Sequence, residues 1–247
     1  MQIRKHAPIV AVAWVVTTAL GLAWALSFSF FPSPAAKEAR VIDGAMTFMT
    51  ALAVPIFALV VVVLVYSALR FRQPGEPTED GPPIHGNLKL ESTWVMVTLG
   101  LVLFLAAYGS FGLMELRHNA AHAENTLVVA VEGNRWFWKF HLPQYNVRTT
   151  NELVLPVGRS VRFDVTAVDV VHSFWVPAFR VKIDAVPGLV TTVSATPDRV
   201  GSYDTDVNFR LQCAELCGLG HGMMVAPVNV VEPSQFEAWV ASKTQSR

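Results

Sequence analysis

Charged residues and cysteines are scarce in this sequence. Only 15% of its 247 residues are charged, against about a quarter in an average soluble protein, and 52% are hydrophobic. The 19 basic and 19 acidic residues cancel, and Lys and Arg form no cluster, which argues against nucleic-acid binding. The high apolar content excludes a disordered chain. Two cysteines are too few for a disulfide framework.

The sequence also lacks internal repeats, low-complexity tracts and the Cys-x-x-Cys-His motif. Without that motif we expect no covalently attached haem c. The length allows one or two domains. The few charged residues are unevenly distributed along this apolar chain. Their distribution separates long uncharged stretches from the rest of the sequence.

Three uncharged stretches fill most of the first half. Residues 7–36, 44–69 and 92–114 contain no Asp, Glu, Lys or Arg. A helix of about 20 apolar residues crosses the hydrocarbon core of a bilayer, and all three stretches are long enough. Such runs leave no polar face for water, so we predict transmembrane helices rather than buried helices of a soluble core.

The first stretch fits two interpretations. Arg4 and Lys5 precede it and the small-residue segment 32–36 follows, as in a signal peptide. Its apolar core, residues 9–31, is longer than the roughly 7–15 residues of a usual signal peptide. Residues 1–36 are therefore a signal peptide or an extra transmembrane helix, and the chain has two to three such helices.

Basic residues predict the orientation in the membrane. Five of them flank the apolar stretches on one side: Arg4, Lys5, Arg70, Arg72 and Lys89. Because basic residues favour the cytoplasmic side, residues 44–116 form a helical hairpin with a cytoplasmic loop at 70–91. Residues 117–247 then lie outside the cytoplasm.

The second half has the pattern of a β domain. Short runs rich in Val, Leu, Phe and Trp alternate with turn residues, which predicts a sandwich or barrel. The expected strands are 126–132, 135–141, 152–157, 160–167, 189–195 and 223–231. Ser234 and Glu237 read as the capping box of a final helix that buries Phe236, Trp239 and Val240. The predicted class is a membrane-anchored all-β protein.

One segment concentrates metal-binding chemistry. Between residues 212 and 224 the chain places Cys213, Glu215, Cys217, His221 and Met224 among glycines that allow tight turns. Thiolate, thioether and imidazole together favour copper. Zinc sites rarely use Met, and calcium or magnesium would want oxygen ligands.

Other interpretations of the same residues are open. The two cysteines could form a disulfide, although a spacing of four requires a sharp bend. Methionines usually fill core gaps, and we interpret Met223 as such a packing residue. A lone histidine among apolar residues, such as His172, is usually a satisfied core group. Here the segment 212–224 of the same domain offers ligands for a soft metal ion and needs a further one to complete the site. This favours His172 as the additional ligand.

The chain resembles subunit II of haem–copper cytochrome c oxidases along almost its whole length. The loop follows the family pattern Cys-x-Glu-x-Cys-x-x-x-His-x-x-Met, and three further segments fit in the same order: 85–94, 133–138 and 169–188. Four motifs in order on a membrane anchor are highly specific. The resemblance implies a cupredoxin-like Greek-key β-sandwich or barrel.

The resemblance also implies a binuclear copper centre, copper A, with two copper ions. Cys213 and Cys217 would bridge both ions. His172 and Met224 would complete one, while His221 and the Glu215 backbone carbonyl would complete the other. The Glu215 side chain would in addition reach a magnesium ion at the interface with subunit I.

Two residues outside the loop match functional positions of the family. Trp136 matches the aromatic residue through which cytochrome c delivers electrons, although it could instead be a core residue. We expect Trp136 and Trp138 to share one strand face because side chains alternate. Glu91 matches the entrance of a proton channel, although an acid is also favoured at a helix N-terminus.

The resulting expectation is an electron-transfer subunit of a proton-translocating cytochrome c oxidase, with oxygen reduced in subunit I. The alternative is the copper A-containing small subunit of a membrane nitric oxide reductase. The expected partners are subunits I and III, cytochrome c or another small electron donor, and lipid, without nucleic acid. The expected location is a prokaryotic plasma membrane, with several spans and an extracytoplasmic C-terminal domain.

Overall fold

The computed structural model describes residues 3–72, 75, 83, 85–121 and 125–245. The chain forms two compact units. The first unit comprises Met1–Phe30 and Gly44–Leu113, and the second comprises Phe31–Asp43 and Met114–Arg247. The second unit is therefore assembled from two pieces that are far apart in the sequence.

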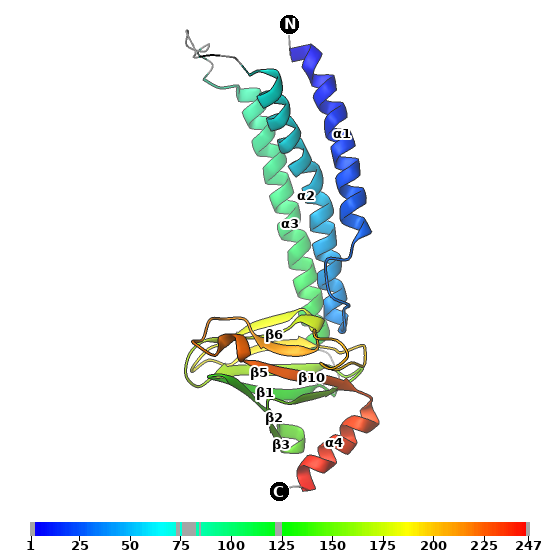
Figure 1. Cartoon of the computed structure of the whole chain (residues 1–247), viewed down its shortest axis with the longest axis vertical. Coiled ribbons are helices and arrows are strands. Elements are labelled where there is room, and N and C mark those ends of the chain that lie inside the picture. Colours follow the sequence, from blue (N-terminus) through cyan, green and yellow to red (C-terminus); the bar gives the residue numbers. More distant parts are fainter. Residues whose placement is uncertain (1–2, 73–74, 76–82, 84, 122–124, 246–247) are drawn as a thin grey trace. The chain divides into compact units, whose positions relative to one another are not determined.

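Three long helices, α1 (Ile3–Ser27), α2 (Lys37–Arg70) and α3 (Leu88–Ala121), account for the apolar stretches (Figure 1). Each is long and apolar enough to cross a membrane, with mean hydropathies of 2.1, 2.9 and 1.9 in its most apolar window. At most 6% of each window is buried, so the apolar side chains remain available to lipid. The predicted two to three membrane-spanning helices are confirmed.

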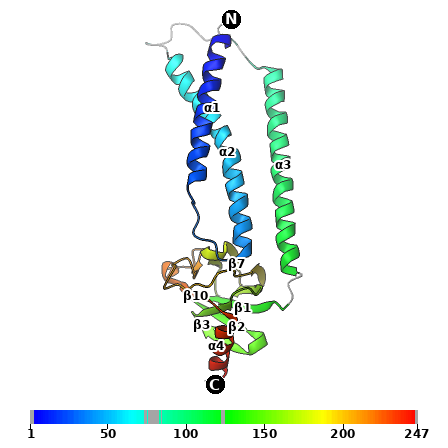
Figure 2. The same cartoon turned by 90° about the vertical axis from the view of Figure 1, so that its right-hand side faces the viewer.

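Contacts within the first unit join these helices. The Trp14 indole in α1 donates to the Pro55 carbonyl of α2 at 2.7 Å, so its N–H is satisfied away from water. Figures 1 and 2 both show α1 beside α2. Phe48 of α2 and Tyr108 of α3 place their ring centroids 4.9 Å apart.

The second unit is a β-sandwich, which confirms the predicted fold class. One sheet has the strand order β3-β2-β1-β5-β8 and the other β4-β10-β9-β6-β7. The β1–β5 and β4–β10 pairs are parallel and the other pairs within the two sheets are antiparallel. The strands found among the described residues are β1 (Leu127–Asn134), β2 (Phe137–Leu142), β3 (Val147–Thr150), β4 (Leu153–Pro156), β5 (Val161–Ala167), β6 (His172–Val176), β7 (Val181–Ala185), β8 (Thr191–Ala195), β9 (Arg210–Cys213) and β10 (Val225–Val231).

Alternating side chains build the core between the sheets. In β1 and β10 every second residue is buried, as expected of strands with one face inward. Phe163 and Phe174 meet in this core with centroids 4.9 Å apart. Each fully buried Val, Leu or Phe side chain contributes about 1.5–3 kcal/mol. This packing holds the strands of the two sheets in fixed positions.

Helix α4 (Pro233–Gln245) follows β10 and ends the described chain (Figure 1). It starts one residue before the predicted Ser234, with Pro233 in the first turn. The Gln235 side chain, rather than Glu237, accepts the Glu232 backbone N–H at 3.3 Å. Phe236 is buried as predicted. The predicted capping box was therefore displaced, while the buried face was correct.

The segment Phe31–Asp43, which we call the anchor segment, is part of the sandwich. The Ala35 N–H donates to the Ala178 carbonyl at 2.9 Å, and the Lys37 N–H donates to the Thr196 carbonyl at 3.0 Å. The side chains of Ala35, Ala36 and Ala39 are fully buried. The anchor segment therefore closes part of the core surface rather than acting as a loose linker.

Arg180 fixes the end of the anchor segment. Its guanidinium binds both carboxylate oxygens of Asp43, at 2.8 and 2.9 Å, and donates to the carbonyls of Pro32 and Pro177. The Arg180 backbone is left-handed with φ 58°, a conformation that costs a residue with Cβ about 1 kcal/mol or more. Four polar contacts of one side chain offset that cost.

Candidate metal centre

The two cysteine thiols lie side by side in the sandwich. Cys213 ends β9 and Cys217 lies four residues later in the following loop, and both are buried. Their Sγ atoms are 3.8 Å apart, about twice the length of a disulfide bond, so both thiols are free. The disulfide alternative does not describe this structure.

Each thiol has further donors beside it. The Cys213 Sγ is 3.8 Å from Nδ1 of His172, at the start of β6, and 3.2 Å from the Glu215 backbone carbonyl. The Cys217 Sγ is 3.6 Å from Nδ1 of His221. All the side chains named here except those of Glu215 and His221 are buried. Residues from two strands and one loop thus converge on one sulfur pair.

Met224 completes this group, which we call the sulfur cluster: His172, Cys213, Glu215 (through its carbonyl), Cys217, His221 and Met224. The Met224 Sδ lies 3.8 Å from the Cys217 Sγ, and the Met224 side chain is fully buried. Met223, one residue earlier, is 80% exposed. Its predicted packing role is wrong, because the short helix His221–Met223 turns this side chain outward.

The donor set fits a soft metal ion. Two thiols, two imidazoles and a thioether are the ligand types that select copper. The three residues His172, Cys213 and Cys217 already place their donor atoms within 4.8 Å of one another. Burial and the adjacent Cys213 thiol raise the pKa of the Cys217 thiol to about 11. A metal ion would therefore have to displace its proton.

Asp169 supports the cluster from behind His172. Its carboxylate lies 2.9 Å from His172 Nε2, the ring nitrogen on the side away from Cys213. It also accepts the backbone N–H groups of Arg135 and Val170 at 2.8 and 2.7 Å. Partial burial opposes ionisation, but these hydrogen bonds hold the pKa of Asp169 well below its usual range. A carboxylate here fixes the imidazole orientation, as is common for metal-binding histidines.

Trp136 lies over the loop that carries the cysteines. It sits in the two-residue turn between β1 and β2 and is 39% exposed, whereas Trp138 in β2 is fully buried. The prediction that the two rings share one strand face is wrong, because the alternation begins only at Phe137. A Cβ placed on Gly220 would lie 2.4 Å from the Trp136 indole, and one on Gly218 would lie 3.6 Å from it. The indole therefore rests on the backbone of both glycines.

Comparison with known proteins decides the family. The family model described as cytochrome c oxidase subunit II, periplasmic domain, matches residues 145–231, and the one described as its transmembrane domain matches residues 21–113. Cytochrome c oxidase subunit 2 of Synechocystis sp. is 30% identical over 92% of this chain and 80% of that protein. The chain belongs to the cytochrome c oxidase subunit II family.

Two further proteins show the same similarity. The probable cytochrome c oxidase subunit 2 of Rickettsia bellii is 30% identical over 91% of this chain and 86% of that protein. The periplasmic domain of subunit II of cytochrome oxidase (CoxB) of Bradyrhizobium japonicum is 31% identical, covering 50% of this chain and 96% of that one, with a TM-score of 0.46. The predicted family and the prediction of a haem–copper oxidase subunit are confirmed.

Within this subunit II chain, Glu91 lies apart from the sulfur cluster. It is in the first turn of α3, where its carboxylate accepts the Asn87 backbone N–H at 2.8 Å. Asn87 in turn accepts the Leu90 backbone N–H at 3.2 Å. These bonds cap the helix, as acids and amides do at helix N-termini. The proton-channel role of Glu91 stays a prediction.

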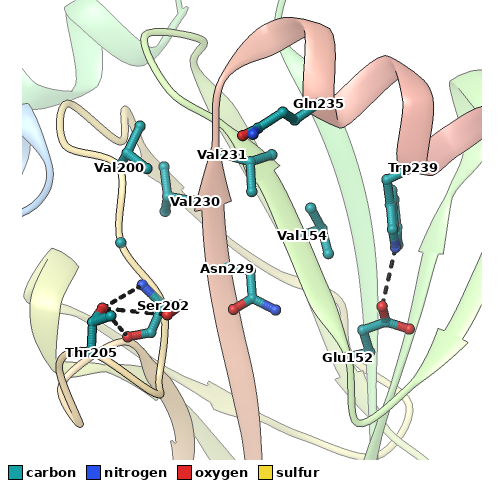
Figure 3. Close-up of a pocket in the computed structure, with 11 residues that line it drawn as sticks. Glu152, Val154, Val200, Ser202, Thr205, Asn229, Val230, Val231, Gln235 and Trp239 are labelled. Atoms are coloured by element: carbon teal, nitrogen blue, oxygen red, sulfur yellow. Dashed lines mark hydrogen bonds between the residues drawn. The ribbon is translucent and has the colours of Figure 1, made fainter.

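A separate cavity of about 560 Å³ lies between β10, β4 and α4 (Figure 3). Figure 3 shows the Trp239 indole donating to Glu152, and Lys243 pairs with the same carboxylate at 2.8 Å. Ser202 and Thr205 bond to each other at the opposite wall. The side chains of Glu152, Ser202 and Thr205 are thus bonded to neighbouring protein groups, and aliphatic valines line much of the rest of the cavity.

The sequence did not predict that Asp169 would contact His172 or that the Trp136 indole would pack on Gly220. Asp169 stands three residues before His172, which is a local spacing that could have indicated the contact. The place of Gly220 under an indole 84 positions away in the sequence could not be read from spacing.

Proposed function

We propose that this chain is the electron-transfer subunit of a terminal cytochrome c oxidase, with a binuclear copper A centre in the sulfur cluster. The observation that carries the proposal is the pair of buried free thiols 3.8 Å apart, each with an imidazole nitrogen within 3.8 Å. Two thiols, two imidazoles, a thioether and a carbonyl are more donors than one four-coordinate ion uses, which favours a site for two ions.

The ligand roles are those that the family resemblance implies. Cys213 and Cys217 would hold both ions through their thiolates. His172 and Met224 would complete one ion, and His221 and the Glu215 carbonyl would complete the other. When bound, the copper pair would supply a one-electron carrier.

The protein contributes burial and rigidity to that carrier. His172, Cys213 and Met224 are fully or almost fully buried, which excludes water from their side of the site. Strands β6 and β9 hold two of these ligands through the Phe174–Cys213 register. A site closed on this side and held by a sheet is suited to electron relay, so the oxygen chemistry belongs to a partner subunit.

Trp136 is the residue through which we propose that electrons arrive. It is half-exposed, and its ring rests on Gly218 and Gly220, next to Cys217 and His221 in the chain. The electron donor in this proposal is cytochrome c or another small redox protein. Subunits I and III are the membrane partners, and the exposed Glu215 side chain is available for a magnesium ion at the subunit I interface.

The proposed location is a prokaryotic plasma membrane, with residues 117–247 as the extracytoplasmic copper A domain. Residues 44–116 form the transmembrane hairpin with loop 70–91, and residues 1–36 form a further helix or a signal peptide. In this arrangement Glu91 lies on the cytoplasmic side, where it marks a proton-channel entrance with subunit I.

The experiment is copper analysis of the purified full-length chain with reduced thiols. We expect two coppers per chain and an electron paramagnetic resonance spectrum of one unpaired electron shared by two copper nuclei. Cys217→Ser removes this spectrum, because serine is a hard and poorly ionised ligand. Met224→Leu alters it, and Met223→Leu is the matched control that leaves it unchanged, since Met223 is 80% exposed.

A single mononuclear copper, or no copper despite reduced thiols, contradicts the proposal. With a binuclear centre established, the purified oxidase complex then distinguishes oxygen from nitric oxide as the substrate of the partner subunit. Oxygen consumption with reduced cytochrome c supports the oxidase, and nitric oxide consumption alone supports the reductase alternative.

A further inference from the structure

Leu219 is the most exposed large apolar side chain among the described residues, at 98%. A lone exposed leucine is ordinary on a protein surface. This one stands between Gly218 and Gly220, the two residues on which the Trp136 indole rests. Leu219 and the exposed part of Trp136 are therefore neighbours on the surface directly above the sulfur cluster.

The rest of the metal-binding loop continues this apolar character. Leu216 is 78% exposed and Met223 is 80% exposed. Three large apolar side chains within eight consecutive residues, all open to water, are unusual for a segment with no partner. Such side chains stabilise a complex when they are buried against another protein.

Charge near this surface is balanced. Arg135, the residue before Trp136, forms an ion pair with Asp169 at 3.3 Å. Within the metal-binding loop Glu215 is the one acidic residue. Residues 118–247 contain 11 basic and 12 acidic residues, so the β domain has almost no net charge. The domain as a whole therefore carries no excess of one sign with which to steer an oppositely charged partner.

We propose that Leu219 and Trp136 form the contact surface for a small electron-donor protein whose prosthetic-group edge is surrounded by uncharged, apolar side chains. The proposal rests on the proposed function, since the surface lies over the metal centre. A donor with a lysine-ringed edge would bury its ammonium groups against leucine and indole without carboxylate partners, which is costly. A donor whose edge is surrounded by apolar side chains would gain binding free energy from the same contact.

The test uses the purified oxidase complex and two probes that differ only in charge. One probe is a basic, lysine-rich cytochrome c, and the other is the same protein with its lysines acetylated. We expect the acetylated probe to have a kcat/KM at least equal to that of the basic one. We also expect kcat/KM to change less than about threefold between 10 and 200 mM salt, because steering by charge is absent.

Variants then locate the surface. Leu219→Lys lowers kcat/KM for the acetylated probe about tenfold or more, and Leu219→Ala lowers it less. Val200→Lys is the matched control. Val200 is 45% exposed and lies beside Gly201, which pairs with Val230 near the far end of β10 from Met224. Val230 lies six positions after Met224 along β10, a rise of about 20 Å, so this variant retains the wild-type kcat/KM.

Two readouts separate this proposal from the proposed function. The copper spectrum and the turnover with a small-molecule reductant are measured for every variant, and both stay at wild-type values in the Leu219 variants. A strong preference for the basic probe with a steep fall in rate as salt rises overturns the apolar-partner proposal. Leu219→Lys kinetics equal to wild type overturn it as well. Loss of the copper spectrum in the wild-type chain contradicts the proposed function instead.

Discussion

The Asp169 carboxylate lies between the His172 imidazole and the backbone of Arg135, 2.9 Å from Nε2 of the first and 2.8 Å from the N–H of the second. It thereby links a proposed copper ligand to the turn that presents Trp136. The orientation of the ligand and the position of the indole depend on one side chain.

The first prediction concerns this link. Asp169→Ala leaves His172 free to rotate, so we expect copper affinity to fall about 10–100-fold, the usual effect of removing the hydrogen-bond partner of a metal-binding histidine. Asp169→Asn should have a smaller effect. The measurements are copper competition titration, the histidine hyperfine coupling and the reduction potential. Asp164→Asn, which disturbs an ion pair with Arg162 and a hydrogen bond from Thr192, is the control. Unchanged coupling and potential in Asp169→Ala would refute the positioning role.

The second prediction is a pH dependence of copper loading. The pKa of the Cys217 thiol is raised to about 11, so at neutral pH this thiol is protonated before metal binds. The Cys217 thiol then releases its proton when copper binds it, and the apparent copper affinity rises with pH by up to about tenfold per unit for that proton. Copper competition between pH 6 and 9, together with proton release in weak buffer, measures this. An affinity independent of pH would show that the Cys217 thiol is already ionised.

The third prediction concerns the packing of the Trp136 indole on Gly220. Gly220→Ala would place a methyl group 2.4 Å from the indole, so the ring must move off the loop. We expect electron transfer from a protein donor to slow about tenfold or more while copper stays bound, as in Trp136→Ala. Gly222→Ala is the control, because a Cβ there meets no atom within 4 Å. Equal donor kinetics in Gly220→Ala and Gly222→Ala would remove the indole position from the pathway.

The fourth prediction concerns stability. The side chains of Arg180 and Asp43 are 10% and 19% exposed, so Arg180→Ala removes the guanidinium from a largely buried carboxylate. We expect the free energy of unfolding to fall by about 2–3 kcal/mol. Arg40→Ala breaks a pair with Asp198 in which Arg40 is 58% exposed, and it serves as the control with little change. Thermal unfolding of the full chain in detergent compares the two, and equal losses would contradict the special role of Arg180.

The sequence predicted the parts of the fold that carry a strong pattern. Long uncharged runs identified α1, α2 and α3, and alternation identified β1, β5 and β10. It did not identify β3, β6, β7 or β9 as strands. Strand β6 is buried at four of its five positions and so lacks an alternating pattern, while β3 and β9 have only four residues each, too few for a recognisable one.

The candidate site was predictable to the extent that its spacing is local. The cysteines, His221 and Met224 lie within twelve positions of one loop, and the sulfur cluster brings all of them together with His172. Trp136 was predicted to lie within a strand, but β2 begins two residues later than expected, at Phe137, and Trp136 lies in the turn before it. Propensity alone does not determine where a turn ends.

The anchor segment has a consequence for biosynthesis. Asp43, near the start of α2, and its partner Arg180 are 137 residues apart, and the rest of α2 and the whole of α3 lie between them. The ribosome therefore finishes the anchor segment long before the strands that receive it, and contacts so distant in sequence form slowly. The sandwich cannot close until both helices have been made, which ties folding of the β domain to completion of its own membrane helices.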